Sequence, residues 1–211
     1  MRLAFFGTPD YAVPVLDAML GSGHHVVGVY TQPDRPSGRG RRMAAAPVKR
    51  YAEERGIPVF QPSSPGRSGT VEVLEALAPD AIVVAAYGRI LPLSVLGIPP
   101  RRALNIHPSL LPRYRGPSPV ATAILDGRSK VGVTLMLMDA GMDTGDIVAQ
   151  RETDALPVET AGELTFRLFN LGAELLRDTL PGWLADSITP VPQDNPQATV
   201  TRLMVKEDGE M

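Results

Sequence analysis

The chain of 211 residues contains no cysteine, and this absence removes several kinds of chemistry. Disulfide bonds, thiolate metal sites and a cysteine nucleophile are excluded, and the composition fits a reducing compartment. No apolar run approaches the roughly 18 residues of a membrane-spanning helix, and the apolar start at residues 1–6 is too short for the core of a signal peptide. We therefore expect a cytoplasmic protein that makes no contact with a membrane.

Neither sign of charge dominates, because 21 lysine and arginine residues face 23 aspartate and glutamate residues. This balance gives no general attraction to nucleic acid. One stretch departs from it and places Arg35, Arg39, Arg41 and Arg42 among glycines and prolines. The stretch is either a solvated surface loop or a flexible clamp for phosphate groups. No aromatic residue lies between the arginines, so base stacking is not indicated there.

The sequence does contain a regular alternation of short apolar runs and helix-like stretches, and its 44% apolar fraction allows one substantial core. Buried strands that alternate with helices are typical of βαβ units. The pattern predicts an α/β fold, with a Rossmann-like, mostly parallel sheet and helices on both faces. The expected strands are residues 3–6, 26–30, 59–60, 81–86, 103–106, 132–138 and 147–152, and the expected helices are 11–20, 47–55, 71–77, 119–125 and 160–180.

From Pro190 onward the composition changes to proline, glutamine, asparagine, aspartate and threonine. Clusters of these residues are typical of loops and linkers. We therefore expect one folded domain over residues 1–189 and a linker over residues 190–211.

The segment Asn105-Ile106-His107 ends one of the expected strands. Side chains alternate between the faces of a strand, so Asn105 and His107 should project the same way while Ile106 packs behind them. In parallel sheets ligands bind beyond the carboxyl ends of the strands, where these two residues lie. An amide can donate to an oxygen that gains negative charge, and an imidazole can move protons near neutral pH.

Asp143 lies in the turn of residues 139–145, between two expected strands. By itself it could be a turn former only. If it reaches His107, its carboxylate can hold the imidazole in one tautomer and stabilise its charged form. The three side chains then form a site for acyl transfer.

Other kinds of site find no support in the motifs. The turn after the first expected strand lacks the spacing G-x-G-x-x-G, and the sequence has neither a phosphate loop nor an H-E-x-x-H motif. No metal is therefore proposed. Ser109 lies two residues from His107 but outside a G-x-S-x-G elbow, so a structural role is favoured over a nucleophilic one.

Further motifs follow one another along nearly the whole chain: residues 6–9 (FGTP), 31–36 (TQPDRP), 47–49 (PVK), 59–62 (VFQP), 86–88 (AYG), 105–116 (NIHPSLLPRYRG) and 143–146 (DTGD). With them the chain resembles the folate-dependent formyltransferases. The resemblance implies the formyltransferase fold and transfer of a formyl group from 10-formyltetrahydrofolate to an amine. It also implies that the acceptor is the α-amine of methionine carried on initiator tRNA, for the initiation of translation. We expect the protein to be a monomer.

The resemblance implies a role for individual residues as well. Asn105, His107 and Asp143 match the catalytic residues of the family, and Arg35, Arg39, Arg41 and Arg42 match a loop that meets the tRNA. In the longer members a C-terminal β-barrel, absent from this chain, follows the segment 190–211. The residues matched to the folate pocket are Tyr87, Gly88, Arg89, Ile90, Leu91, Ser109, Leu110, Leu111 and Pro112.

Two alternatives stay open at this point. A formyltransferase that acts on a small amine, such as glycinamide ribonucleotide or an amino sugar, would use the same three residues. A noncatalytic RNA-binding module would use the arginines but would leave the convergence of Asn105, His107 and Asp143 unexplained.

Overall fold

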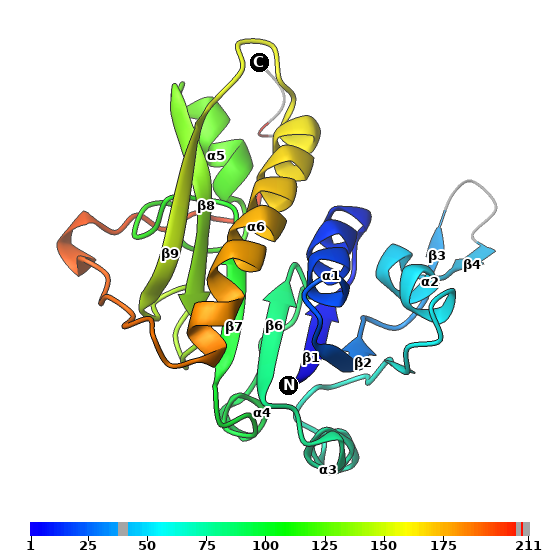
Figure 1. Cartoon of the computed structure of the whole chain (residues 1–211). Coiled ribbons are helices and arrows are strands. Elements are labelled where there is room, and N and C mark those ends of the chain that lie inside the picture. The colour runs from blue at the N-terminus through cyan, green and yellow to red at the C-terminus, as the bar shows by residue number, and fades with distance from the viewer. Residues whose placement is uncertain (38–41, 206–207, 209–211) are drawn as a thin grey trace.

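A single seven-stranded sheet forms the centre of the computed structural model, which describes residues 1–37, 42–205 and 208. The strands lie in the order β5-β2-β1-β6-β7-β8-β9 (Figure 1). The first five run parallel, and β8 and β9 are antiparallel to their neighbours, which confirms the predicted mostly parallel sheet. Their bounds are β1 (Arg2–Gly7), β2 (His25–Tyr30), β5 (Val59–Phe60), β6 (Ala81–Ala85), β7 (Ala103–His107), β8 (Lys130–Leu137) and β9 (Ile147–Asp154).

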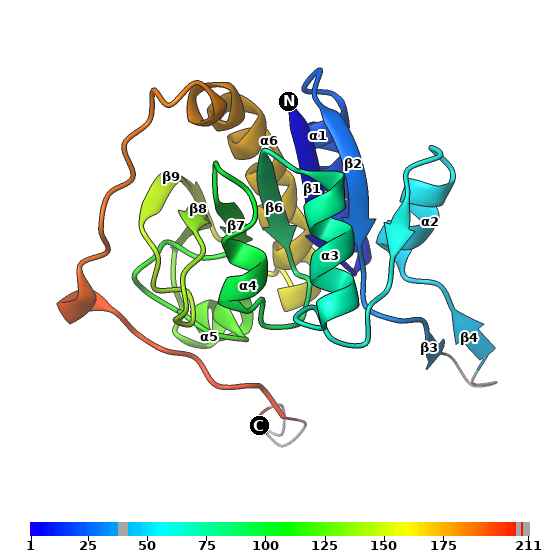
Figure 2. The same ribbon diagram turned by 90° about the horizontal axis from the view of Figure 1, so that it is seen from below.

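Helices cover both faces of the sheet, also as predicted. Helices α1 and α6 pack on one face and α3 and α4 on the other (Figure 2). Helix α2 joins the core beneath α1, and α5 packs against α6. Their bounds are α1 (Val13–Leu20), α2 (Pro47–Glu53), α3 (Ser68–Leu77), α4 (Leu93–Leu96), α5 (Pro119–Leu125) and α6 (Ala161–Leu184).

The alternation of side chains in β1 explains why both faces need a cover. Leu3 and Phe5 point into the core beneath α1, whereas Ala4 and Phe6 point into the core beneath α3 and α4. All four are fully buried, which is why the strand reads as a continuous apolar run rather than as alternating apolar and polar residues.

Helix α6 is fixed at its start and pressed against the sheet in its middle. Thr160 and Glu163 form a reciprocal capping box at its N-terminus, as the sequence predicts. A Cβ atom on Gly172 would lie 2.7 Å from a methyl group of Ile106, so only glycine allows this close approach to β7. None of the helices in the described ranges has both the length and the apolarity to traverse a lipid bilayer.

The direction of the strand order reverses between β1 and β6, which places a crevice at the carboxyl ends of the central strands. The chain passes from β1 outward to β2 and β5, then returns to β6 and continues to β7 on the other side. Thr8 follows β1, Tyr87 follows β6, and His107 ends β7. The topology therefore gathers these three segments at one edge of the sheet.

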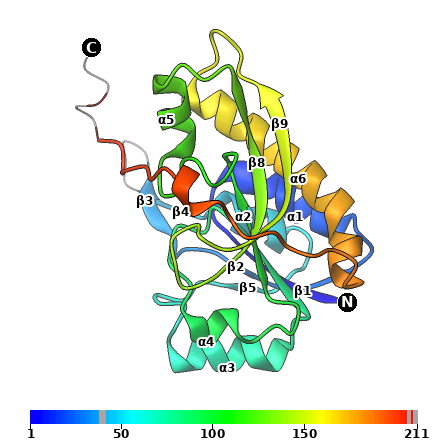
Figure 3. The ribbon, with the colours of Figure 1, turned by 90° about the vertical axis from the view of Figure 1, so that its left-hand side faces the viewer.

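Three features of the fold were not predicted. Strands β3 (Arg35–Ser37) and β4 (Arg42–Ala44) pair as a small antiparallel hairpin, and α4 is a single turn. Residues 191–204, which we call the C-terminal strap, lie along the domain instead of leaving it (Figure 3). The strap forms bridges between Val191 and Ile147 and between Val200 and Arg115. The domain boundary expected at residue 189 stays a prediction.

Replacing a core leucine of α6 should reveal how strongly this helix holds the sheet. Leu176 is fully buried in the core beneath α1 and α6, and we expect Leu176→Ala to lower the free energy of unfolding by about 2 to 5 kcal/mol. Urea denaturation followed by circular dichroism measures this. The control is Leu156→Ala, because Leu156 is 55% exposed. Equal losses in the two variants would contradict the assignment of Leu176 to the core.

Candidate active site

Asn105 and His107 line a cavity of about 700 Å³ at the carboxyl end of β7. Ile106, between them, is 2% exposed and packs in the core beneath α6. The alternation expected from the sequence therefore holds. No hydrogen bond of the Asn105 side chain is found within residues 1–37, 42–205 and 208, which leaves its amide available to a ligand in the cavity.

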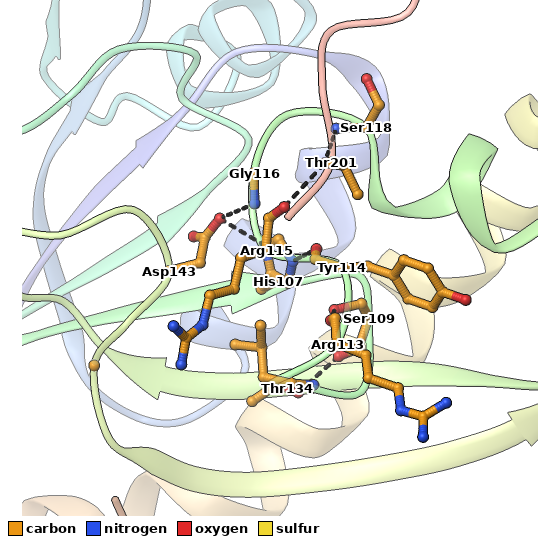
Figure 4. Close-up of polar contacts among 12 residues, drawn as sticks. His107, Ser109, Arg113, Tyr114, Arg115, Gly116, Ser118, Thr134, Asp143 and Thr201 are labelled. Carbon is orange, nitrogen blue, oxygen red and sulfur yellow. Dashed lines mark hydrogen bonds and ion pairs between the residues drawn. The ribbon is translucent and has the colours of Figure 1, made fainter. Parts of the chain in front are cut away.

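The ring of His107 is held by a backbone carbonyl (Figure 4). Its Nε2 atom lies 2.9 Å from the carbonyl oxygen of Tyr114. A carbonyl oxygen only accepts hydrogen bonds, so Nε2 carries a proton and the neutral ring has an unprotonated Nδ1. The sequence suggested that a carboxylate would fix the tautomer. In the structure Tyr114 fixes it, and Nδ1 is left for chemistry.

Asp143 faces this free nitrogen. Its Oδ2 atom lies 3.6 Å from Nδ1 of His107 and accepts a 2.8 Å hydrogen bond from the backbone N–H of Gly116. The first distance is within ion-pair range but too long for a hydrogen bond. A carboxylate at this position stabilises a proton that arrives at Nδ1, and the side chains of Asn105, His107 and Asp143 meet at one cavity.

The backbone around the imidazole is unusual at two positions. Tyr114 and Asp143 have φ angles of 61° and 55°, in the left-handed region that favours glycine. Such conformations persist only where the surroundings hold them. For Tyr114 the backbone N–H donates to Thr199 of the C-terminal strap, and the hydroxyl donates to Asp126. Sequence reasoning missed Tyr114, because the role belongs to its carbonyl and carries no side-chain signature.

The residues expected at the folate pocket fall into two groups. Tyr87, Gly88, Arg89, Ile90 and Leu91 line the same cavity as Asn105 and His107. The others line a second pocket of about 390 Å³ between the 108–114 loop, α5 and α6; these are Ser109, Leu110, Leu111 and Pro112.

Ser109 is engaged in the loop that it belongs to. Its hydroxyl donates to the carbonyl of Arg113, and its carbonyl accepts from Thr134. It is 5% exposed. These contacts fit the structural role favoured from the sequence and give the hydroxyl no general base.

Gln32 joins the hairpin of β3 and β4, which we call the arginine hairpin, to the cavity. Sequence reasoning did not single this residue out. Its amide donates to the carbonyls of Tyr87 at 2.9 Å and Gly88 at 3.0 Å. Its Oε1 atom accepts from Arg35 at 2.5 Å. One side chain therefore contacts both the loop that lines the cavity and the strand that begins the hairpin.

A network of charged and amide side chains holds Gln32 in place. Lys49 forms a 2.7 Å ion pair with Asp34, and the Gln61 amide donates to Asp34 and to the carbonyl of Gln32. The hydrogen bonds from Lys49 and Gln61 lower the pKa of the Asp34 carboxyl below its ordinary value. The same ion pair raises the pKa of Lys49.

Two of the four expected tRNA-binding arginines lie on the hairpin of β3 and β4. Arg35 is exposed on β3, and Arg42 belongs to β4. Arg39 and Arg41 lie outside the described residues. Within the ranges that are described, no three histidine or acidic side chains gather as metal ligands.

Comparisons with known proteins agree on one family. Residues 1–180 match the family model described as "Formyl transferase". The methionyl-tRNA formyltransferase of Chloroflexus aurantiacus is 53% identical over 99% of this chain and 67% of its own length. The crystal structure of glycinamide ribonucleotide transformylase 1 from Geobacillus kaustophilus is 30% identical, with a TM-score of 0.71 over 87% of this chain and 98% of that one. An N-formyltransferase from Helicobacter canadensis, solved with folinic acid and dTDP-3-aminofucose, is 20% identical. Its TM-score is 0.70 over 95% of this chain and 70% of that one.

The charge of Asp34 should matter for stability in a defined pH range. A carboxyl whose pKa is lowered on folding stabilises the fold above its unfolded value of about 3.9 and loses this effect as the pH falls through the folded value. We expect Asp34→Asn to lower the urea midpoint near pH 6 and the difference from wild type to shrink below about pH 4. A difference that stays constant down to pH 3 would show that the carboxylate charge does not hold the network.

Proposed function

The chain belongs to the formyl transferase family, and from this we propose that it transfers a formyl group from 10-formyltetrahydrofolate to the α-amine of methionine on initiator tRNA. The observation that carries the proposal is the meeting of Asn105, His107 and Asp143 at one cavity. The 53% identity to a methionyl-tRNA formyltransferase favours this acceptor.

The cavity suits a folate. Its volume of about 700 Å³ lies within the range of pockets that hold ligands of this size. Apolar groups from Val84, Tyr87 and Leu91 line its wall, and Ile90, 88% exposed, stands at its rim. When bound, the folate supplies the formyl group. Tyr87, Gly88, Arg89, Ile90 and Leu91 would hold it, and Ser109, Leu110, Leu111 and Pro112 would support the pocket from the neighbouring loop.

Asn105 and His107 then act on the carbonyl that the amine attacks. The Asn105 amide donates a hydrogen bond to the formyl oxygen as this oxygen gains negative charge. His107 presents Nδ1, because Nε2 is already bonded to Tyr114. The ring therefore takes and returns protons through Nδ1, toward the attacking amine and the departing nitrogen.

Asp143 supports the charged form of His107. Its carboxylate faces Nδ1 at 3.6 Å, so it favours the protonated ring electrostatically while Gly116 holds the carboxylate in place. The formyl group passes directly to the amine without a covalent intermediate on the protein. The Ser109 hydroxyl is already hydrogen-bonded to Arg113, and the chain has no cysteine that could act as the nucleophile.

A small amine is the second candidate acceptor. The structure from Geobacillus kaustophilus, a glycinamide ribonucleotide transformylase, shares 30% identity with the chain. The arginine hairpin favours tRNA, because clustered arginines neutralise phosphates along a polynucleotide backbone. Incubating the chain and labelled 10-formyltetrahydrofolate with methionyl initiator tRNA and, in parallel, with glycinamide ribonucleotide shows which amine gains the label.

Removing the amide of Asn105 should slow the reaction without unfolding the protein. Loss of one oxyanion donor costs about a hundredfold to a thousandfold in kcat, so we expect Asn105→Ala to fall in that range with a nearly unchanged melting temperature. Steady-state formylation of methionyl-tRNA measures it. The control is Asn170→Ala, since Asn170 is exposed on α6. Near-normal turnover by Asn105→Ala would remove Asn105 from the mechanism.

The arginine stretch should govern affinity for tRNA and not for folate. We expect the triple replacement of Arg39, Arg41 and Arg42 by alanine to raise the KM for tRNA. If each arginine contacts one phosphate, the slope of the logarithm of the tRNA binding constant against the logarithm of the salt concentration should fall by up to about 3. The control removes three exposed charges elsewhere, at Arg55, Arg67 and Arg177. An unchanged KM for tRNA in the first variant would favour a small acceptor.

A further inference from the structure

Gln193, in the C-terminal strap, contacts the backbone beneath the active site. The residue is 8% exposed although the strap around it is largely exposed. Its Nε2 atom donates to the carbonyls of Asp143 at 2.9 Å and Gly145 at 2.7 Å. It therefore binds the turn that presents the Asp143 carboxylate to His107.

The oxygen atom of the same amide is hydrogen-bonded as well. The Oε1 atom of Gln193 accepts from Arg115, at 3.0 Å from Nε and 2.7 Å from Nη2. Arg115 is 7% exposed and directly follows Tyr114, whose carbonyl fixes the His107 ring. One amide group thus connects the two backbone segments that hold His107 and Asp143.

The chemistry of this contact requires an amide. Guanidinium groups bind carboxylates more strongly than neutral oxygens, so a buried arginine alone would favour glutamate at position 193. A glutamate has no N–H to donate, and its charge would face the carbonyl oxygens of Asp143 and Gly145. An amide is the group of this size that accepts from Arg115 and donates to both carbonyls.

The backbone of Asp143 explains why such a contact is needed. Its φ of 55° is costly for a residue with a side chain, and such a conformation is kept only by surrounding contacts. The strap also closes over the partner segment. The N–H and the hydroxyl of Thr201 both donate to the carbonyl of Arg115, the N–H of Arg115 donates to the carbonyl of Thr199, and Gly116 leaves no room for a Cβ atom beside Thr201.

We infer that Gln193 is a positioning residue for formyl transfer, which holds Asp143 against Nδ1 of His107 from outside the cavity. The residue does not line the cavity, so it should act on turnover and not on substrate binding. Only the kinetic test of this inference rests on the proposed function. The strap is then part of the catalytic unit, although the family model ends at residue 180.

The sharpest variant is Gln193→Glu, which keeps the oxygen that Arg115 binds and removes the two N–H donors. A misplacement of about 1 Å in a catalytic group can cost about a hundredfold in rate, so we expect kcat to fall by up to that factor with the KM for folate unchanged. The matched control is Gln197→Glu, which places the same charge in the same strap, where the side chain is exposed and, among the described residues, donates to Asp194 alone. It should keep wild-type kcat.

A double-mutant cycle separates positioning from general damage. If Gln193 acts through Asp143, Gln193→Glu should cause no further loss of kcat in an Asp143→Ala background. The same fold loss in both backgrounds, or a wild-type kcat for Gln193→Glu, would overturn the inference. Should Gln193→Glu lower the melting temperature too far for assay, Gln193→Asn, which keeps the amide but shortens its reach, takes its place in the cycle.

A measurement without substrates keeps this test apart from the proposed function. In nuclear magnetic resonance spectra of the free protein, the ring signals of His107 should move in the same direction in Gln193→Glu and Asp143→Asn, and stay in place in Gln197→Glu. Ring signals unchanged in Gln193→Glu would contradict the inference. A chain that formylates no tRNA but shows the shared shift would fail the proposed function and keep the positioning role.

Discussion

The hydrogen bond from Nε2 of His107 to the carbonyl of Tyr114 is the interaction on which the candidate active site depends. It assigns the proton of the neutral ring to one nitrogen and turns the other toward Asp143 and the cavity. The geometry requires Tyr114 to adopt a left-handed backbone, which the loop alone would not keep. Contacts of its N–H with Thr199 and of its hydroxyl with Asp126 supply the support. The orientation of one ring thus depends on a loop, on the end of α5 and on the C-terminal strap.

The sheet determines where this ring stands. β7 is the last of the parallel strands and pairs with the antiparallel β8, so its carboxyl end opens onto the crevice while its middle is locked on both sides. Gly172 lets α6 approach Ile106, which lies between Asn105 and His107. Packing from behind therefore fixes the direction in which both polar side chains project, and it uses core contacts that have no part in the reaction.

Much of the fold could be predicted because its signals are local. Continuous apolar runs identify buried strands, the pair Thr160 and Glu163 identifies the start of α6, and strand alternation puts Asn105 and His107 on one side. The hairpin and α4 could not be predicted, because three or four residues carry too little pattern. The strap was expected to be a linker, since a polar, proline-rich composition looks the same whether hydrogen bonds hold the segment or not. Gln193 was missed for a related reason: its partners are 48 to 78 residues away in the chain.

The amide of Gln32 has a consequence for how two substrates share this molecule. It holds two carbonyls at the cavity proposed for the formyl donor and at the same time accepts a hydrogen bond from Arg35 of the hairpin. A ligand that binds Arg35 breaks or weakens its hydrogen bond to the Gln32 amide. A ligand that moves the loop at Tyr87 and Gly88 shifts Gln32 and therefore the position of Arg35. Because coupling between binding sites is reciprocal, we expect the affinities for donor and acceptor to depend on each other to the same degree in both directions. The order in which the two partners arrive would then influence the path of assembly but leave the stability of the ternary complex unchanged.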